Sequence, residues 1–262
     1  MAKSVHFYRS RIKFIKVKIA EENMNLLKIL IVDESLIFAP APMDKSRLEG
    51  LKLSLIYAQL AARGTGESPD SSGYFSEVQK KLETKGWLVN SSRNSSISLQ
   101  ELTTPKSLAE FVLKPFVAPL IPKNNVWPSW EIILRFFENA STQTEISDAL
   151  NFWWKNVYTN GLLYMSIGAI FPTNTPSMPF QVEIIRFGLD PSQIKVEHSG
   201  SGKSTFNPEI WSSLFKKEIV QIPPIEIQNL SLKLDISRYQ EGMNYPLKQK
   251  LISAVEAHVR SV

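Results

Sequence analysis

The N-terminal part of the chain alternates basic with apolar residues, which predicts β structure. Over residues 11–19, lysine or arginine alternates with isoleucine, valine or phenylalanine, the period-two pattern of a half-buried strand. The alternation slips between Phe14 and Ile15, which predicts a β-bulge. A polar stretch then leads into an apolar run at residues 26–32, and the two segments together predict a hairpin. Its basic face, with the bulge re-aiming the second pair, comprises Arg11, Lys13, Lys16 and Lys18.

Apolar residues spaced three and four apart predict helices over residues 44–63, 74–85 and 146–158. Asp44 is the expected N-cap of the first helix, and Thr142 with Glu145 forms a capping-box pattern before the third. Shorter helices are expected near residues 106–113 and 209–217. A C-terminal amphipathic helix is predicted after Pro246, with one apolar face made by Leu247, Leu251, Val255 and Val259.

The rest of the chain has β character. Residues 87–89 and 97–99 predict a second hairpin around a polar tip at residues 90–96. Helices gather in the middle of the sequence and strands at both ends, so alternating βαβ units and a doubly wound parallel sheet are disfavoured. We predict an α+β fold with a mixed or largely antiparallel sheet, a central group of helices and a C-terminal amphipathic helix. The remaining predicted strands are residues 162–171, 180–187, 193–197 and 225–236.

The chain is expected to form a single α+β domain over residues 1–262. Its length is close to that at which one hydrophobic core begins to divide into two. Prolines are concentrated at residues 115–128, so this stretch is the predicted boundary if the domain has two lobes.

Positive charge is concentrated at the N-terminus. The whole chain has a net charge of +5, and its first twenty residues contain six basic and no acidic side chains, which leaves −1 for the remainder. Such a block attracts anionic lipid headgroups or nucleic acid. The alternative is an edge strand whose charges merely discourage pairing with other sheets. The six residues predicted to bind an anionic surface are Lys3, Arg9, Arg11, Lys13, Lys16 and Lys18.

No sequence motif predicts catalysis, a metal or a cofactor. Residues 200–205 end like a phosphate-binding loop, but Glu197 occupies the position that needs glycine and Pro208 delays the helix, so a polar hairpin tip is expected. The three histidines are far apart, and there is no cysteine to bind metal or form a disulfide. The adjacent carboxylates Asp33 and Glu34 are interpreted as solvated charges at a turn. We therefore predict a protein that is not an enzyme.

Trp153 and Trp154 are adjacent in a predicted helix and cannot both face a single core. One of them is therefore predicted to meet a partner helix, a subunit or a membrane interface. The alternative is a helix packed on two sides, which buries both indoles. The predicted partner interface combines Trp153 and Trp154 with Leu251 and Val255.

These features predict a non-enzymatic assembly or adaptor protein, the kind of task that a viral matrix protein performs. It would bind anionic lipid or a nucleoprotein through the basic hairpin and form a homo-oligomer. We expect an intracellular, cytoplasmic or membrane-peripheral location, because cysteine is absent and no secretory signal or transmembrane segment is evident. Two alternatives remain: a membrane-perturbing, pore-forming toxin with amphipathic helices over a sheet, and an enzyme whose site is assembled in space.

Overall fold

The computed structural model describes most of the chain between residues 12 and 259. The described ranges are residues 12–17, 27–114, 133–137, 144–196 and 219–259, with gaps at 41–42, 44, 68, 70, 72, 99, 109, 112–113, 134 and 160–161. The predicted helix at 209–217, the string at 200–205 and the proline-rich boundary at 115–128 lie outside these residues.

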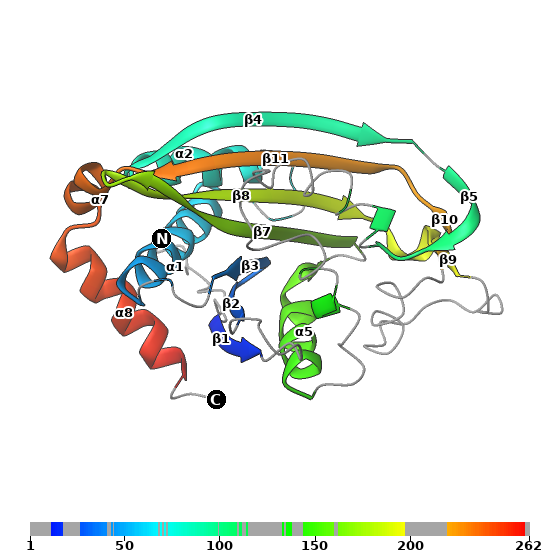
Figure 1. The fold of residues 1–262 in the computed structure, drawn as a ribbon, viewed down its shortest axis with the longest axis horizontal. Helices are drawn as coiled ribbons and strands as arrows, with labels where there is room; N and C mark the ends of the chain where they lie inside the picture. The colour runs from blue at the N-terminus through cyan, green and yellow to red at the C-terminus, as the bar shows by residue number, and fades with distance from the viewer. Residues whose placement is uncertain are drawn as a thin grey trace, which may run out of the picture.

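A mixed, largely antiparallel sheet runs through the centre of the described structure (Figure 1). Its strand order is β1-β2-β3-β7-β8-β11-β4, with the short β6 (Tyr158–Thr159) beside β7. Only β3 and β7 are parallel among these neighbours. The strands are β1 (Ile12–Val17), β2 (Leu27–Val32), β3 (Ser35–Ala39), β4 (Trp87–Ile97), β7 (Leu162–Thr175), β8 (Met178–Leu189) and β11 (Ile225–Leu234). A smaller sheet has the order β5 (Gln100–Lys106), β10 (Ile219–Ile222), β9 (Lys195–Val196), and the 3-10 turn η4 (Pro191–Gln193) precedes β9.

Helices pack on both faces of the main sheet. On one face lie α1 (Lys45–Gly64), α2 (Tyr74–Glu83) and α8 (Tyr245–Val259), with α7 (Ile236–Gly242) leading into α8 (Figure 1). On the other face lies α5 (Thr144–Val157). None of the described helices combines the length and the apolar character that crossing a membrane requires. The α+β class and the C-terminal helix are therefore as predicted.

The two faces of the sheet carry separate apolar cores. Along β2, Leu30 and Val32 join the core beneath α1, α2 and α8, whereas Ile29 and Ile31 join the core beneath α5. This division follows from the strand period of two, which sends successive side chains to opposite faces. All four side chains are at most 1% exposed, so β2 is buried on both faces.

The N-terminal hairpin is present, but the predicted bulge is not. β1 and β2 pair antiparallel from Ile12 opposite Val32 to Val17 opposite Leu27, without a shift of register. Lys13 lies opposite Ile31, and Lys16 lies opposite Lys28. Because positions three apart on a regular strand belong to opposite faces, these two lysine positions do not share a face of the sheet.

The second predicted hairpin is wrong: residues 87–97 form the single strand β4. Its polar centre, which resembles a loop in sequence, is polar because it is exposed at the edge of the sheet. Serine and asparagine at residues 90–96 run along β11 in one continuous ladder, with one register shift beside Asn90. Exposure on an outer strand thus imitates the composition of a turn.

Candidate functional site: a polar latch at the β2–β3 turn

The turn between β2 and β3 consists of two acidic residues, Asp33 and Glu34. Val32 and Ser35 close it as a cross-strand pair. Asp33 has a backbone φ of 52°, a left-handed conformation that aspartate tolerates better than branched residues do. Contrary to the sequence interpretation, both carboxylates are buried, with Asp33 6% and Glu34 2% exposed.

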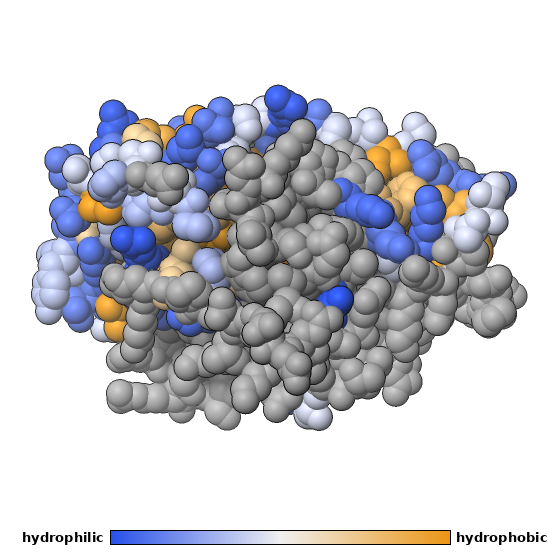
Figure 2. Space-filling view, in the orientation of Figure 1, coloured by the Kyte–Doolittle hydropathy of each residue, from blue (hydrophilic) through white to orange (hydrophobic). Residues whose placement is uncertain are grey.

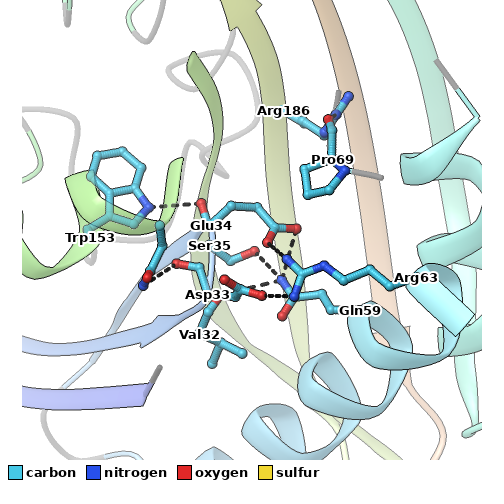
Figure 3. A network of polar contacts seen from close by, with 10 residues as sticks. Val32, Asp33, Glu34, Ser35, Gln59, Arg63, Pro69, Trp153 and Arg186 are labelled. Atoms are coloured by element: carbon cyan, nitrogen blue, oxygen red, sulfur yellow. Dashed lines mark hydrogen bonds and ion pairs between the residues drawn. The ribbon is translucent and has the colours of Figure 1, made fainter. Parts of the chain in front are cut away.

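One arginine and one glutamine of α1 reach these carboxylates (Figure 3). Arg63 makes ion pairs with Asp33 through Nη1 and with Glu34 through Nη2, the latter at 3.2 Å from Oε2. Gln59 Nε2 lies 3.2 Å from Glu34 Oε1 and 3.1 Å from Ser35 Oγ. We call Asp33, Glu34, Gln59 and Arg63 the turn latch, because they join α1 to the sheet through charged and polar contacts.

The latch is electrostatically matched although it is buried. Burial alone lowers the pKa of Arg63, but the charges of Asp33, Tyr74 and Glu34 outweigh it, and the pKa is raised above its ordinary value. Burial raises the pKa of the Tyr74 hydroxyl well above its ordinary value, and Glu34 raises it further. Arg63 therefore stays charged and Tyr74 stays protonated at neutral pH, so the latch keeps a permanent cation against its carboxylates.

The same turn is held from the opposite face by α5. Trp153 Nε1 donates a hydrogen bond of 2.8 Å to the Glu34 carbonyl oxygen, and Asn156 Nδ2 donates one of 3.3 Å to the Asp33 carbonyl oxygen. The backbone N–H of Ser166 on β7 also donates to the Glu34 carbonyl, at 3.0 Å. The turn is thus the point where the α1 layer, the sheet and the α5 layer are joined by polar contacts (Figure 3).

A second buried cation, Arg186 of β8, joins α2 and the preceding loop to the sheet. Its Nη1 donates 2.9 Å to Gln228 Oε1, and its Nη2 donates to the Pro69 carbonyl. Its guanidinium lies 5.7 Å from the Tyr74 ring centroid and 5.1 Å from that of Tyr164. Cation–π contacts of this kind gain strength when they are desolvated, and Arg186 is 5% exposed. The α1–α2 layer is therefore held at two buried cations in addition to its apolar contacts.

A third polar group lies on β8 and β11. Glu183 Oε1 accepts hydrogen bonds from Ser231 Oγ, at 2.7 Å, and from Gln181 Nε2. Its Oε2 has no hydrogen-bond partner among the described residues, and the side chain is 5% exposed. Burial raises the pKa of Glu183, although the bonds from Ser231 and Gln181 and the charge of Lys233 oppose this.

Replacing Glu183 by glutamine is expected to stabilise the protein at neutral pH relative to acidic pH. Because the folded-state pKa is raised above the ordinary value of about 4.3, the unfolded chain loses its proton first as the pH rises. The contribution of Glu183 to stability therefore falls between that value and the raised folded pKa, and the uncharged amide avoids this loss. Thermal unfolding followed by circular dichroism at pH 4 and pH 7 should show a gain in Tm at pH 7 that shrinks at pH 4.

Glu226→Gln is the matched control, because Glu226 lies on the same strand as Ser231 but is exposed. It should change Tm little at either pH. An equal pH-dependent gain in both variants would contradict the role given to burial at Glu183.

The residues predicted to bind an anionic surface lie mostly beyond the described part of the chain. Lys3, Arg9, Arg11 and Lys18 are outside it, and only the backbone of Lys13 and Lys16 is described, in β1 at the edge of the sheet. Their role in binding therefore stays a prediction.

Of the predicted interface residues, the two tryptophans are buried within the chain. Trp153 is 0% and Trp154 1% exposed, and their rings pack together with centroids 5.0 Å apart. This is the outcome expected of a helix packed on two sides, the alternative stated above. Leu251 is buried in the core beneath α1 and α8, and the side chain of Val255 lies outside the described ones.

Sequence analysis missed the latch, although a signal was present. Asp33 and Glu34 stand between two strands that are apolar at nearly every position, and Arg63 ends a helix that is apolar on its packed face. Acidic residues in a two-residue turn between fully buried strands have little access to water, so they need a cation from another element. The sequence does not say which cation, because Arg63 is 29 residues from Glu34.

No group of three or more metal-ligating side chains comes together among the described residues. No protein-family model matches the sequence. No curated protein matches it either.

Two solved structures have a similar arrangement of elements. A delta-endotoxin aligns with a TM-score of 0.42 at 10% sequence identity, over 89% of this chain and 91% of its own. The Evf virulence factor aligns with a TM-score of 0.36 at 15% identity, over 84% of this chain and 74% of its own. Likenesses of this degree carry no argument about function.

Proposed function

We propose that this chain is a non-enzymatic, membrane-perturbing protein. In this proposal the basic N-terminal segment attaches to anionic headgroups, and the α1–α2 layer then separates from the sheet and exposes an apolar surface to the bilayer. The observation that carries the proposal is the burial of both faces of a largely antiparallel sheet beneath separate helical layers.

An antiparallel sheet commonly leaves one face in water, with polar side chains on that face. Here the face beneath α1 and α2 is apolar across five neighbouring strands, and it becomes water-exposed only if the helices leave. Each exposed Å² of such surface costs about 25 cal/mol in water but little in a lipid interior. A bilayer therefore supplies the one environment in which a separated sheet face is stable. The buried side chains include Leu30, Val32, Ile37, Ile170, Val182, Ile184, Leu230 and Leu232.

The polar contacts of the α1–α2 layer set the barrier to this separation. Apolar contacts with the sheet can be exchanged for contacts with lipid, whereas the ion pairs of Arg63 with Asp33 and Glu34 have to be broken. Breaking a buried pair leaves uncompensated charges, which costs several kcal/mol. The turn latch therefore keeps the protein closed in solution.

Attachment is assigned to the basic segment, of which β1 is the outermost strand of the sheet. Each lysine or arginine near an anionic bilayer contributes about 1 kcal/mol, so six give reversible binding that salt weakens. This step does not need the basic positions to share one face, because the segment as a whole lacks acidic residues.

The test uses vesicles of phosphatidylcholine with and without phosphatidylserine, loaded with a self-quenched dye. We expect the protein to bind and to release dye only from the anionic vesicles, with both effects reduced by salt. The triple variant Lys13→Glu, Lys16→Glu, Lys18→Glu should lose binding and release together. The matched control reverses three exposed lysines elsewhere, Lys80, Lys114 and Lys250, and should keep most of both.

Two outcomes would overturn the proposal in different ways. Binding without any release of dye would favour the assembly or adaptor function, in which the protein stays folded on the surface. Release that is unchanged by the triple variant would remove the basic segment from the mechanism. Co-sedimentation with RNA across the same salt series separates nucleic-acid binding from lipid binding.

A further inference from the structure

We infer that β4 forms a self-association edge, through which two copies of this chain join their sheets into one continuous antiparallel sheet. β4 is the outermost strand of the main sheet and pairs with β11 along one side (Figure 1). Within the described residues no strand pairs with its other side. The backbone N–H and C=O groups along that side are therefore available to another strand.

The composition of β4 leaves this edge open. Natural edge strands are usually protected by proline, by lysine or by bulges. Residues 91–97 contain no proline and a single charge, Arg93, and the register shift of the strand lies before them, beside Asn90. Residues 92–96 are all exposed, and the rim of the molecule along β4 is mainly hydrophilic in Figure 2. A polar edge of this kind pairs through its backbone without forming an aggregation-prone apolar patch.

The geometry of antiparallel pairing limits the possible registers. Two residues that stand opposite each other either both point their N–H and C=O across the gap or both point them away. When two copies of one strand pair about a twofold axis, opposed residues must therefore differ by an even number of positions, and the axis passes through a residue. Over residues 91–97 the axis can pass through Arg93, Asn94 or Ser95 with at least five residues paired.

The register centred on Asn94 is favoured over its neighbours. An axis through Arg93 places two arginines directly opposite each other, which is destabilising. An axis through Ser95 pairs only residues 93–97 and puts Arg93 opposite Ile97. An axis through Asn94 pairs all seven residues, and sets Arg93 opposite Ser95 and Ser92 opposite Ser96. The two Asn94 side chains then meet and can exchange amide hydrogen bonds.

A second copy is thus the occupant that the strand itself specifies. The sequence of β4 complements itself about Asn94, in side-chain size and in hydrogen-bonding groups, and places no like charges opposite each other. The result is an isologous dimer with one closed interface, the commonest symmetry of protein oligomers. This inference does not rest on the proposed function, because an edge dimer is compatible with either membrane perturbation or surface assembly.

The absence of cysteine from the chain permits a register-specific test. In Asn94→Cys the two thiols of a dimer face each other, whereas in Ser92→Cys they are offset by four residues, about 13 Å along the strand. Under mild oxidation the first variant should form disulfide-linked dimer at least about tenfold faster than the second. A mixture of Ser92→Cys with Ser96→Cys should cross-link as a heterodimer, which provides a second test if Asn94→Cys misfolds.

Sedimentation of the unmodified protein completes the test, over a concentration series from about 1 µM to about 1 mM. We expect a reversible shift from monomer to dimer. A single monomeric species throughout the series would overturn the inference. Equal cross-linking of Asn94→Cys and Ser92→Cys would overturn the register, and with it the argument for self-complementarity.

Discussion

Arg63→Met is expected to lower the free energy of unfolding by about 3–5 kcal/mol, the usual cost of removing one partner from a buried ion pair. The arginine faces two carboxylates that are 6% and 2% exposed, and its own side chain is 16% exposed. Methionine fills a similar length but leaves Asp33 and Glu34 as two buried charges without their cation. Urea denaturation followed by circular dichroism measures the loss.

Two further variants separate the charge effect from the loss of packing. Asp33→Asn and Glu34→Gln, added to Arg63→Met, should recover part of the stability because the buried charges are removed on both sides. Arg238→Met removes an arginine that is 66% exposed and 3.8 Å from Asp235, and should change stability by no more than about 0.5 kcal/mol. A loss in Arg63→Met as small as that in Arg238→Met would show that the latch contributes little.

The same variant bears on the proposed function. If the turn latch sets the barrier to separation of the α1–α2 layer, Arg63→Met releases dye faster than the unmodified protein at equal amounts bound to vesicles. Comparison at equal binding is needed because the substitution also removes a positive charge. Slower or unchanged release would place the barrier elsewhere in the molecule.

Trp153→Ala is expected to destabilise the fold by about 3–5 kcal/mol, the usual cost of truncating a fully buried aromatic side chain. The indole is 0% exposed, packs on Trp154 and belongs to the core beneath α5. Its removal leaves a cavity between α5 and the sheet, beside the β2–β3 turn. Denaturant unfolding measures the loss, and near-ultraviolet circular dichroism reports the altered packing of Trp154.

Trp153→Phe divides this effect into its two parts. Phenylalanine keeps most of the buried area but cannot donate to the Glu34 carbonyl oxygen. That oxygen still accepts from the Ser166 N–H, so the lost bond is expected to cost only about 1 kcal/mol. Tyr245→Ala is the control for an aromatic residue in solvent, since Tyr245 is 74% exposed, and should be nearly neutral. If Trp153→Ala were also nearly neutral, α5 would not be part of the folded core.

Where one element packs against a single apolar surface, the local pattern predicted it well. Residues 44–63 have leucines at helical spacing and form α1, and residues 162–171 lie within β7. The N-terminal hairpin was predicted from alternation alone and is present. In each of these segments the side-chain period is recorded in the sequence, so no distant contact is needed to recognise it.

Elements whose environment is unusual for their composition were predicted less well. The strand β4 resembles a loop because its serines and asparagines face water at the edge of the sheet. The β1 strand keeps regular pairing where the slip in its alternation predicted a bulge. It continues without a bulge because β2, its partner, is apolar on both faces and can accept apolar side chains on either. In both strands the neighbour, and not the strand, decides the conformation.

Amino-acid order was therefore sufficient for the α+β class, for most helices and strands, and for the segregation of positive charge at the N-terminus. These properties depend on residues close together in the chain. The turn latch required the tertiary structure, because Glu34 meets Arg63 only after α1 folds back over the sheet, and meets Trp153 from 119 residues away. Burial converts two ordinary acidic turn residues into a charged junction of three layers, and burial is a property of the whole fold.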